Sequence, residues 1–132
     1  MNGDMTTVLI ADDDEDILAL VERALSESGY EVLLARDGAT ALATAREQKP
    51  ALALLDIAMP ELDGYEVTSK LKSDPATMDT IVILFTARSE ASDVEKGYEA
   101  GADDYIMKPF TLKTLQSRVA AALGHASETA QT

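Results

Sequence analysis

The chain has 132 residues, of which 46% are hydrophobic and 27% are charged, and these values predict one globular domain with its own core. The 24 acidic and 11 basic residues give a net charge of −13, so we expect this chain to bind neither nucleic acid nor anionic membranes. The absence of cysteine excludes disulfides and thiolate metal sites, and no apolar run approaches the ~18 residues of a membrane span, so we expect a cytoplasmic protein.

Five short apolar runs recur along the chain, and a segment with helical periodicity follows each of them. The runs are Val8–Ala11, Val32–Ala35, Ala51–Leu55, Ile81–Phe85 and Tyr105–Met107. Most are continuous rather than alternating, which is typical of parallel strands that helices cover on both faces. We expect Met107 to belong to the core.

The first and last helical segments each have an apolar stripe. The stripe residues are Ile17, Leu20, Val21, Ala24 and Leu25 in the first segment, and Leu112, Leu115, Val119 and Leu123 in the last. Gly29 and Gly124 follow these segments, where a left-handed residue is expected to end a helix. Asp14 and Glu15 are expected to cap the start of the first helix and to interact favourably with its dipole.

The strict alternation of strands and helices predicts an α/β fold, a doubly wound five-stranded parallel sheet with helices on both faces and right-handed crossovers. No repeat, low-complexity tract or linker divides the chain. We therefore expect one domain over residues 1–124, followed by a polar C-terminal tail over residues 125–132.

Polar residues stand where the predicted strands end. Asp12 and Asp13 follow the first run, Asp56 the third, Thr86 the fourth and Lys108 the fifth. In a doubly wound sheet these ends form one edge, where ligands bind. The sequence therefore predicts a site of three carboxylates, a hydroxyl and an ammonium group.

The charges of this predicted site favour magnesium and phosphoryl transfer. Asp12, Asp13 and Asp56 carry −3 when ionised, and a divalent cation together with Lys108 would neutralise them. A site of oxygen ligands without histidine or cysteine favours a hard ion, magnesium before calcium. An aspartate can also attack phosphorus to form an aspartyl phosphate, which would take the site from 0 to −1. Thr86 is the nearest side-chain donor for that added charge.

Four motifs give the chain a family resemblance from Thr7 to about Leu123. They are Val8-Leu9-Ile10-Ala11-Asp12-Asp13, Leu55-Asp56-Ile57-Ala58-Met59-Pro60-Glu61-Leu62-Asp63-Gly64, Phe85-Thr86-Ala87, and Gly101-Ala102-Asp103-Asp104-Tyr105-Ile106-Met107-Lys108-Pro109-Phe110. With these motifs the chain resembles the receiver domains of response regulators. The resemblance implies the flavodoxin-like strand order 2-1-3-4-5.

The resemblance also implies roles for the residues of the site. Asp56 is expected to accept a phosphoryl group from a histidine kinase or a phosphotransfer protein. Asp13 is expected to bind Mg²⁺ directly and Asp12 to act on it largely through water. The backbone carbonyl of Ala58 is expected to be a further ligand. Lys108 is expected to contact the phosphoryl oxygens, and its bond to Pro109 is expected to be cis.

A second group of residues is implied to transmit the signal. Thr86 is expected to move towards the phosphoryl group, and Tyr105 to rotate with it as an aromatic switch. Ala58 and Arg88 occupy positions that, in such domains, tune how long the phosphoryl group survives, and the same role is expected of them here. The expected output is a changed surface on the fourth helix, fifth strand and fifth helix, which would bind a downstream protein or a covalently linked effector domain. A weak homodimer is compatible with this picture.

Three other classes of protein share part of this sequence pattern. Asp12, Asp14 and Asp16 imitate the start of an EF-hand loop, but Ile17 and Arg23 stand where that loop needs glycine and glutamate. A haloacid-dehalogenase-type phosphatase also uses a strand-end aspartate and magnesium, although the chain is too short to include a substrate cap. A flavin-binding flavodoxin relative would need a Ser/Thr/Gly-rich phosphate loop, which the first loop lacks.

Overall fold

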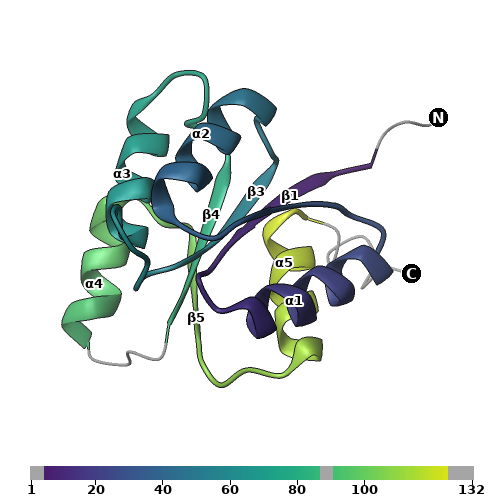
Figure 1. The fold of residues 1–132 in the computed structure, drawn as a ribbon. Coiled ribbons are helices and arrows are strands. Elements are labelled where there is room, and N and C mark those ends of the chain that lie inside the picture. The colour runs from purple at the N-terminus through teal and green to yellow at the C-terminus, as the bar shows by residue number, and fades with distance from the viewer. Residues whose placement is uncertain (1–4, 87–90, 125–132) are drawn as a thin grey trace.

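The computed structural model describes residues 5–86 and 91–124, with side chains described for residues 5–85 and 94–124. Within these residues, strands and helices alternate as the sequence predicts (Figure 1). The strands are β1 (Thr7–Ala11), β2 (Glu31–Ala35), β3 (Leu52–Asp56), β4 (Ile81–Thr86) and β5 (Asp104–Met107). The helices are α1 (Glu15–Glu27), α2 (Gly38–Gln48), α3 (Gly64–Ser73), α4 (Ala91–Ala100) and α5 (Leu112–Ala122).

The five strands form one parallel sheet in the order β2-β1-β3-β4-β5, which confirms the predicted fold class and strand order. At its carboxyl end, each of the strands β3 and β4 extends one residue beyond the apolar run that predicted it. Asp56 pairs with Phe85, and Thr86 pairs with Met107. Both polar residues are therefore held in the sheet itself rather than in the loops that follow it.

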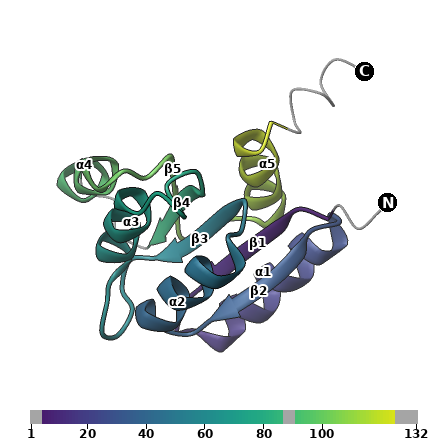
Figure 2. The same ribbon diagram turned by 90° about the horizontal axis from the view of Figure 1, so that it is seen from above.

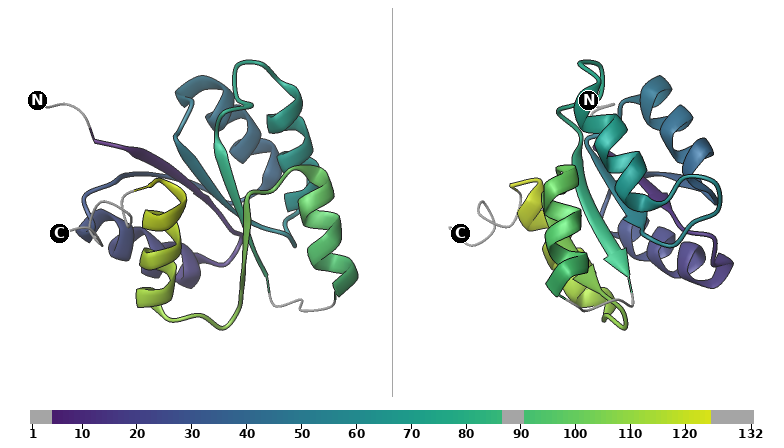
Figure 3. Two further views of the ribbon diagram at one scale, coloured as in Figure 1. Left: turned by 180° about the vertical axis from the view of Figure 1, so that it is seen from behind. Right: turned by 90° about the vertical axis from the view of Figure 1, so that its left-hand side faces the viewer.

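Helices cover both faces of the sheet (Figures 2 and 3). Residues of α2, α3 and α4 pack on one face, together with inward-facing strand residues such as Leu9 and Leu55. Residues of α1 and α5 pack on the other face, against strand residues such as Ile10 and Leu54. The two clusters confirm that the central strands are buried on both faces, which explains their continuous hydrophobicity.

Three residues of the predicted core and apolar stripes are exposed: Leu20, Met107 and Leu112. Leu20 is 52% exposed, and α1 instead buries Leu18, which the predicted stripe omits. At 100° per residue, Leu20 lies about 130° from the direction midway between Leu18 and Val21 and so faces away from the sheet. Met107 is 46% exposed because β5 is an edge strand, whose last residue has a neighbouring strand on one side only.

The ends of the helices follow the predicted capping residues. The carboxylate of Asp14 accepts hydrogen bonds from the backbone amides of Asp16 and Ile17 at the start of α1. Gly29 and Gly124 both have left-handed backbone conformations, with φ of 96° and 83°. Asp63 and Glu66 form a reciprocal capping box at the start of α3, which fixes where the β3–α3 loop ends.

The predicted C-terminal tail of residues 125–132 lies outside the described residues, so the boundary at residue 124 stays a prediction. None of the described helices combines the length and the hydrophobicity that crossing a lipid bilayer requires.

Candidate functional site

Side chains at or just after the ends of three strands meet at the carboxyl edge of the sheet. Asp12 follows β1, Asp56 ends β3 and Lys108 follows β5. The ammonium group of Lys108 lies 3.0 Å from Oδ2 of Asp12 and 3.6 Å from Oδ2 of Asp56. The structure therefore brings together charged groups that the sequence separates by 96 and 52 positions.

Asp12 is fully buried, and hydrogen bonds occupy both of its carboxylate oxygens. Oδ2 accepts from Lys108, and Oδ1 accepts from the backbone amide of Asp14 at 2.9 Å. Its own backbone amide donates to the carbonyl of Ala35 at 3.1 Å, which ties the β1–α1 loop to the end of β2. These bonds give a buried carboxylate the partners that it needs.

Asp56 is only 6% exposed, and its environment is less favourable to a negative charge. Oδ1 accepts a 3.4 Å hydrogen bond from the backbone amide of Ala58. Burial raises the pKa of Asp56 to about 6, and repulsion from Asp12 adds to this effect, while the charge of Lys108 opposes it. Because the ionised form of Asp56 is unfavourable in this environment, a cation that binds it would stabilise that form.

Asp13 completes a group that fits a metal ion. Three carboxylate oxygens, one from each of Asp12, Asp13 and Asp56, all lie within 4.8 Å of one another. Asp13 is exposed, whereas the other two are buried, so this side chain can meet an ion from solvent. An all-oxygen set of three carboxylates matches the preference of Mg²⁺ for hard ligands and for retaining some water.

Lys108 has aromatic neighbours that sequence reasoning missed. Its ammonium group lies 5.0 Å from the centre of the Phe85 ring, and Phe110 meets that ring edge-on with the two centres 6.0 Å apart. The aromatic face attracts the cation and restricts where the side chain can point. Phe85 and Phe110 are the only phenylalanines in the chain. Phe85 directly precedes Thr86, and Phe110 follows Lys108 by two positions.

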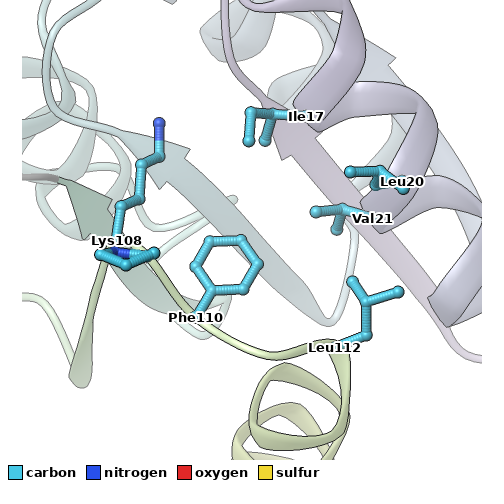
Figure 4. A pocket seen from close by; sticks show the side chains of 7 residues that line it. Ile17, Leu20, Val21, Lys108, Phe110 and Leu112 are labelled. Atoms are coloured by element: carbon cyan, nitrogen blue, oxygen red, sulfur yellow. The ribbon is translucent and has the colours of Figure 1, made fainter.

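An apolar cavity of about 460 Å³ lies beside Lys108 (Figure 4). It is lined by Ile17, Leu20 and Val21 of α1 and by Lys108, Pro109, Phe110 and Leu112 of the β5–α5 connection. The exposed Leu20 therefore contributes to the wall of a hollow in the surface rather than to the core. The bond between Lys108 and Pro109 is cis, as predicted.

The residues predicted to transmit a signal lie on β4, β5 and the connection between β4 and α4. Thr86 ends β4, one strand away from Asp56, and its side chain lies outside the described set. Tyr105 is buried among the residues that face α2, α3 and α4, so this aromatic ring already points inward. Arg88 lies outside the described residues, and the role given to it stays a prediction.

A family model for the response regulator receiver domain matches residues 8–120 of the chain. The chain belongs to the response regulator receiver family. The receiver resemblance drawn from the four motifs is thus confirmed, and the phosphatase alternative is not favoured.

Individual relatives agree with this assignment. The transcriptional regulatory protein PrrA of Mycobacterium tuberculosis is 48% identical over 123 residues, which cover 93% of this chain and 52% of PrrA. The chain thus spans about half the length of this relative. The solved structure of the chemotaxis protein CheY4 of Vibrio cholerae is 29% identical, with a TM-score of 0.85, covering 89% of this chain and 98% of that one.

A third relative was solved with a metal ion. The receiver domain of the sensor histidine kinase PA1611 from Pseudomonas aeruginosa is 30% identical to this chain, with a TM-score of 0.84, and covers 91% of this chain and 98% of its own. That structure has a magnesium ion coordinated in its active site cleft. The TM-scores show that both solved structures share the fold that gathers the carboxylates of this chain at one edge of its sheet.

Proposed function

We propose that this receiver domain accepts a phosphoryl group on Asp56 and uses it to change a protein-binding surface. The observation that carries the proposal is the position of Asp56, a buried strand-end carboxylate beside Lys108 and within 4.8 Å of two further carboxylates. Its pKa of about 6 leaves it largely ionised at neutral pH, so it can act as a nucleophile.

In the proposed reaction, a carboxylate oxygen of Asp56 attacks the phosphorus of a phosphohistidine on a sensor kinase or phosphotransfer protein. The phosphorus–nitrogen bond breaks as the phosphorus–oxygen bond forms, and the imidazole keeps the electron pair of the broken bond. The product is an aspartyl phosphate, which water later hydrolyses to aspartate and phosphate. The chain thus acts as a signalling domain that is consumed and regenerated rather than as an enzyme for a free substrate.

We further propose that Asp13, Asp56 and the backbone carbonyl of Ala58 hold Mg²⁺, with Asp12 acting largely through water. A bound Mg²⁺ would neutralise the carboxylates and the phosphoryl oxygens. Asp12 suits an indirect role because hydrogen bonds from Lys108 and Asp14 occupy its two oxygens. The magnesium reported for the PA1611 receiver supports this choice of ion.

Lys108 is proposed to stabilise the transferred group. Its ammonium group bridges Asp12 and Asp56 and is held over Phe85, so it already lies near the acceptor oxygen. A short movement from Asp12 would place it against the phosphoryl oxygens. Thr86 and Tyr105 are proposed to couple the new charge to α4, β5 and α5, and Ala58 and Arg88 to set its lifetime.

The partners are proposed from the family. They are a sensor histidine kinase or phosphotransfer protein upstream, and a downstream protein or a covalently linked effector domain as the output. The relative PrrA is a transcriptional regulatory protein, about half of which this chain matches. We propose a cytoplasmic location, weak or no self-association, and no nucleic-acid binding by the described domain itself.

Intact-mass spectrometry tests the assignment of Asp56. Wild type incubated with acetyl phosphate and Mg²⁺ should gain the mass of one phosphoryl group, and Asp56→Asn should gain none. Asp16→Asn, an exposed substitution in the first turn of α1, is the matched control and should label like wild type. Equal labelling of Asp56→Asn would refute the assignment, and many turnovers without a stable label would favour a phosphatase.

A further inference from the structure

The β2–α2 connection contacts both loops of the proposed metal site, although it contributes no ligand to it. The carbonyl of Ala35, the last residue of β2, accepts a 3.1 Å hydrogen bond from the backbone amide of Asp12. The next residue, Arg36, pairs with Glu15, with one hydrogen bond of 3.1 Å between Nη2 and Oε1. Glu15 begins α1 directly after the Asp12-Asp13-Asp14 loop, so this loop is held at both of its ends.

The other end of the connection touches the β3–α3 loop, residues 57–63. Gly38 is the first residue of α2, and a Cβ at this position would lie 2.0 Å from the backbone oxygen of Leu62 and 2.7 Å from its carbonyl carbon. Atoms of the backbone cannot rotate away as the end of a flexible side chain can. The contact between α2 and this loop therefore exists only because residue 38 has no side chain.

The β3–α3 loop is tightly braced, so a displacement at Leu62 would pass along it. The backbone amide of Leu62 donates a 2.9 Å hydrogen bond to the carbonyl of Pro60, and the amide of Met59 donates one of 3.1 Å to the carbonyl of Ile57. Gly64 closes the loop with a 2.9 Å bond from its amide to the carbonyl of Ile57. Ala58, the proposed carbonyl ligand, lies between these bonds.

We infer that Ala35–Gly38 is a positioning element that sets the distance between the two metal-binding loops. Gly38 is its critical residue, and Arg36 is its second contact. The two loops carry Asp13 and Ala58, which must face one ion at the same time. This inference rests on the proposed function, because it concerns the Mg²⁺ site proposed there.

The first test is a magnesium titration of Gly38→Ala. The added methyl group must push the start of α2 and the β3–α3 loop apart, so the half-saturating Mg²⁺ concentration should rise about tenfold, at the lower end of the range for residues that orient metal ligands. Isothermal titration calorimetry measures this value without any phosphorylation. Circular dichroism and a melting curve establish that the variant is folded.

Gly29→Ala is the matched control. Gly29 has a φ of 96°, so alanine strains the backbone there, but a Cβ would meet nothing within 4 Å. It should lower stability and leave magnesium affinity unchanged. A folded Gly38→Ala that binds Mg²⁺ like wild type would overturn the inference, whereas failure of wild type to bind Mg²⁺ would overturn the proposed metal site itself.

Arg36→Gln decides the matter if Gly38→Ala does not fold. Arg36 is exposed, so its replacement spares the core. Loss of the positive charge of Arg36 would by itself remove a repulsion of Mg²⁺ and tighten its binding, whereas a loosened loop should weaken binding about twofold. Arg23→Gln, which breaks the exposed pair with Glu27 farther along α1, is the control. Unchanged or tighter binding by Arg36→Gln would then refute the inference.

Discussion

Lys108 keeps two neighbouring carboxylates in one site. Its ammonium group is closer to Asp12 than to Asp56, at 3.0 Å against 3.6 Å. Asp12 therefore receives the stronger contact, and Asp56 retains a raised pKa despite having a cation beside it. Asp56, the residue proposed to react, is thus the less stabilised of the two carboxylates, which favours its bonding to an incoming electrophile or cation.

The raised pKa of Asp56 predicts a dependence of stability on pH. Because its pKa is about 6 in the folded protein and 3.8 ordinarily, the folded state binds more protons between these values. Stability from this group is therefore highest below about pH 4 and falls as pH rises through about 6. Without metal, Asp56→Asn should exceed wild type in stability at about pH 7.5, by on the order of 2 kcal/mol, and this difference should vanish near pH 4.

Urea unfolding in a metal chelator measures the difference at both pH values. Asp16→Asn serves again as the control, because Asp16 is exposed and lies outside the carboxylate cluster. If the stabilisation by Asp56→Asn were equal at both pH values, the raised pKa would be excluded as its cause.

At the scale of elements, the sequence predicted the order and type of all ten described helices and strands, and the ends of the strands located the site. It failed where burial depends on a neighbour. Leu20 and Met107 are apolar, but no local pattern reveals that α1 turns Leu20 away from the sheet or that β5 lies at its edge. The approach of Gly38 to Leu62 was equally hidden, because it depends on how α2 packs against a distant loop.

Helix α4 is the element that we expect to respond to phosphorylation. Its Tyr98 is 47% exposed and its Val94 is only partly buried, so the described side chains of α4 make few buried contacts, which makes local motion inexpensive. Gly97 brings the helix close to the ring of Tyr105, since a Cβ there would lie 3.5 Å from ring atoms. Because Tyr105 is already buried, phosphorylation is expected to fix this inward position rather than to create it.

Amide hydrogen exchange with and without beryllofluoride, which mimics the phosphoryl group, tests this expectation. Exchange should change in α4, β5 and the start of α5, and the last turn of α2, at the end opposite Gly38, serves as the internal reference. In Thr86→Ala the probe should still bind at Asp56, but the change in α4 should be smaller. Changes limited to the loop after Asp56, with none in residues 86–120, would contradict the proposed coupling.

At the scale of the whole molecule, Mg²⁺ should raise the melting temperature. An ion that binds only the folded chain stabilises it by mass action, by about 1.4 kcal/mol at ten times its Kd. Asp13→Asn should abolish the effect while leaving the fold intact, because Asp13 is exposed. The Asp16→Asn control should keep it. An equal melting shift in Asp13→Asn would remove Asp13 from the metal site.

The contact between Lys108 and Asp12 joins residues 96 positions apart. During synthesis Asp12 and Asp56 leave the ribosome long before Lys108 does, and β5 must join β4 before the lysine can reach them. A nascent or proteolytically shortened chain that lacks β5 would hold Asp56, the proposed acceptor, without the ammonium group of Lys108 beside it. If the proposed function holds, the chain could accept a phosphoryl group only once β5 has joined the sheet, so incomplete copies could not consume phosphoryl groups of the proposed kinase.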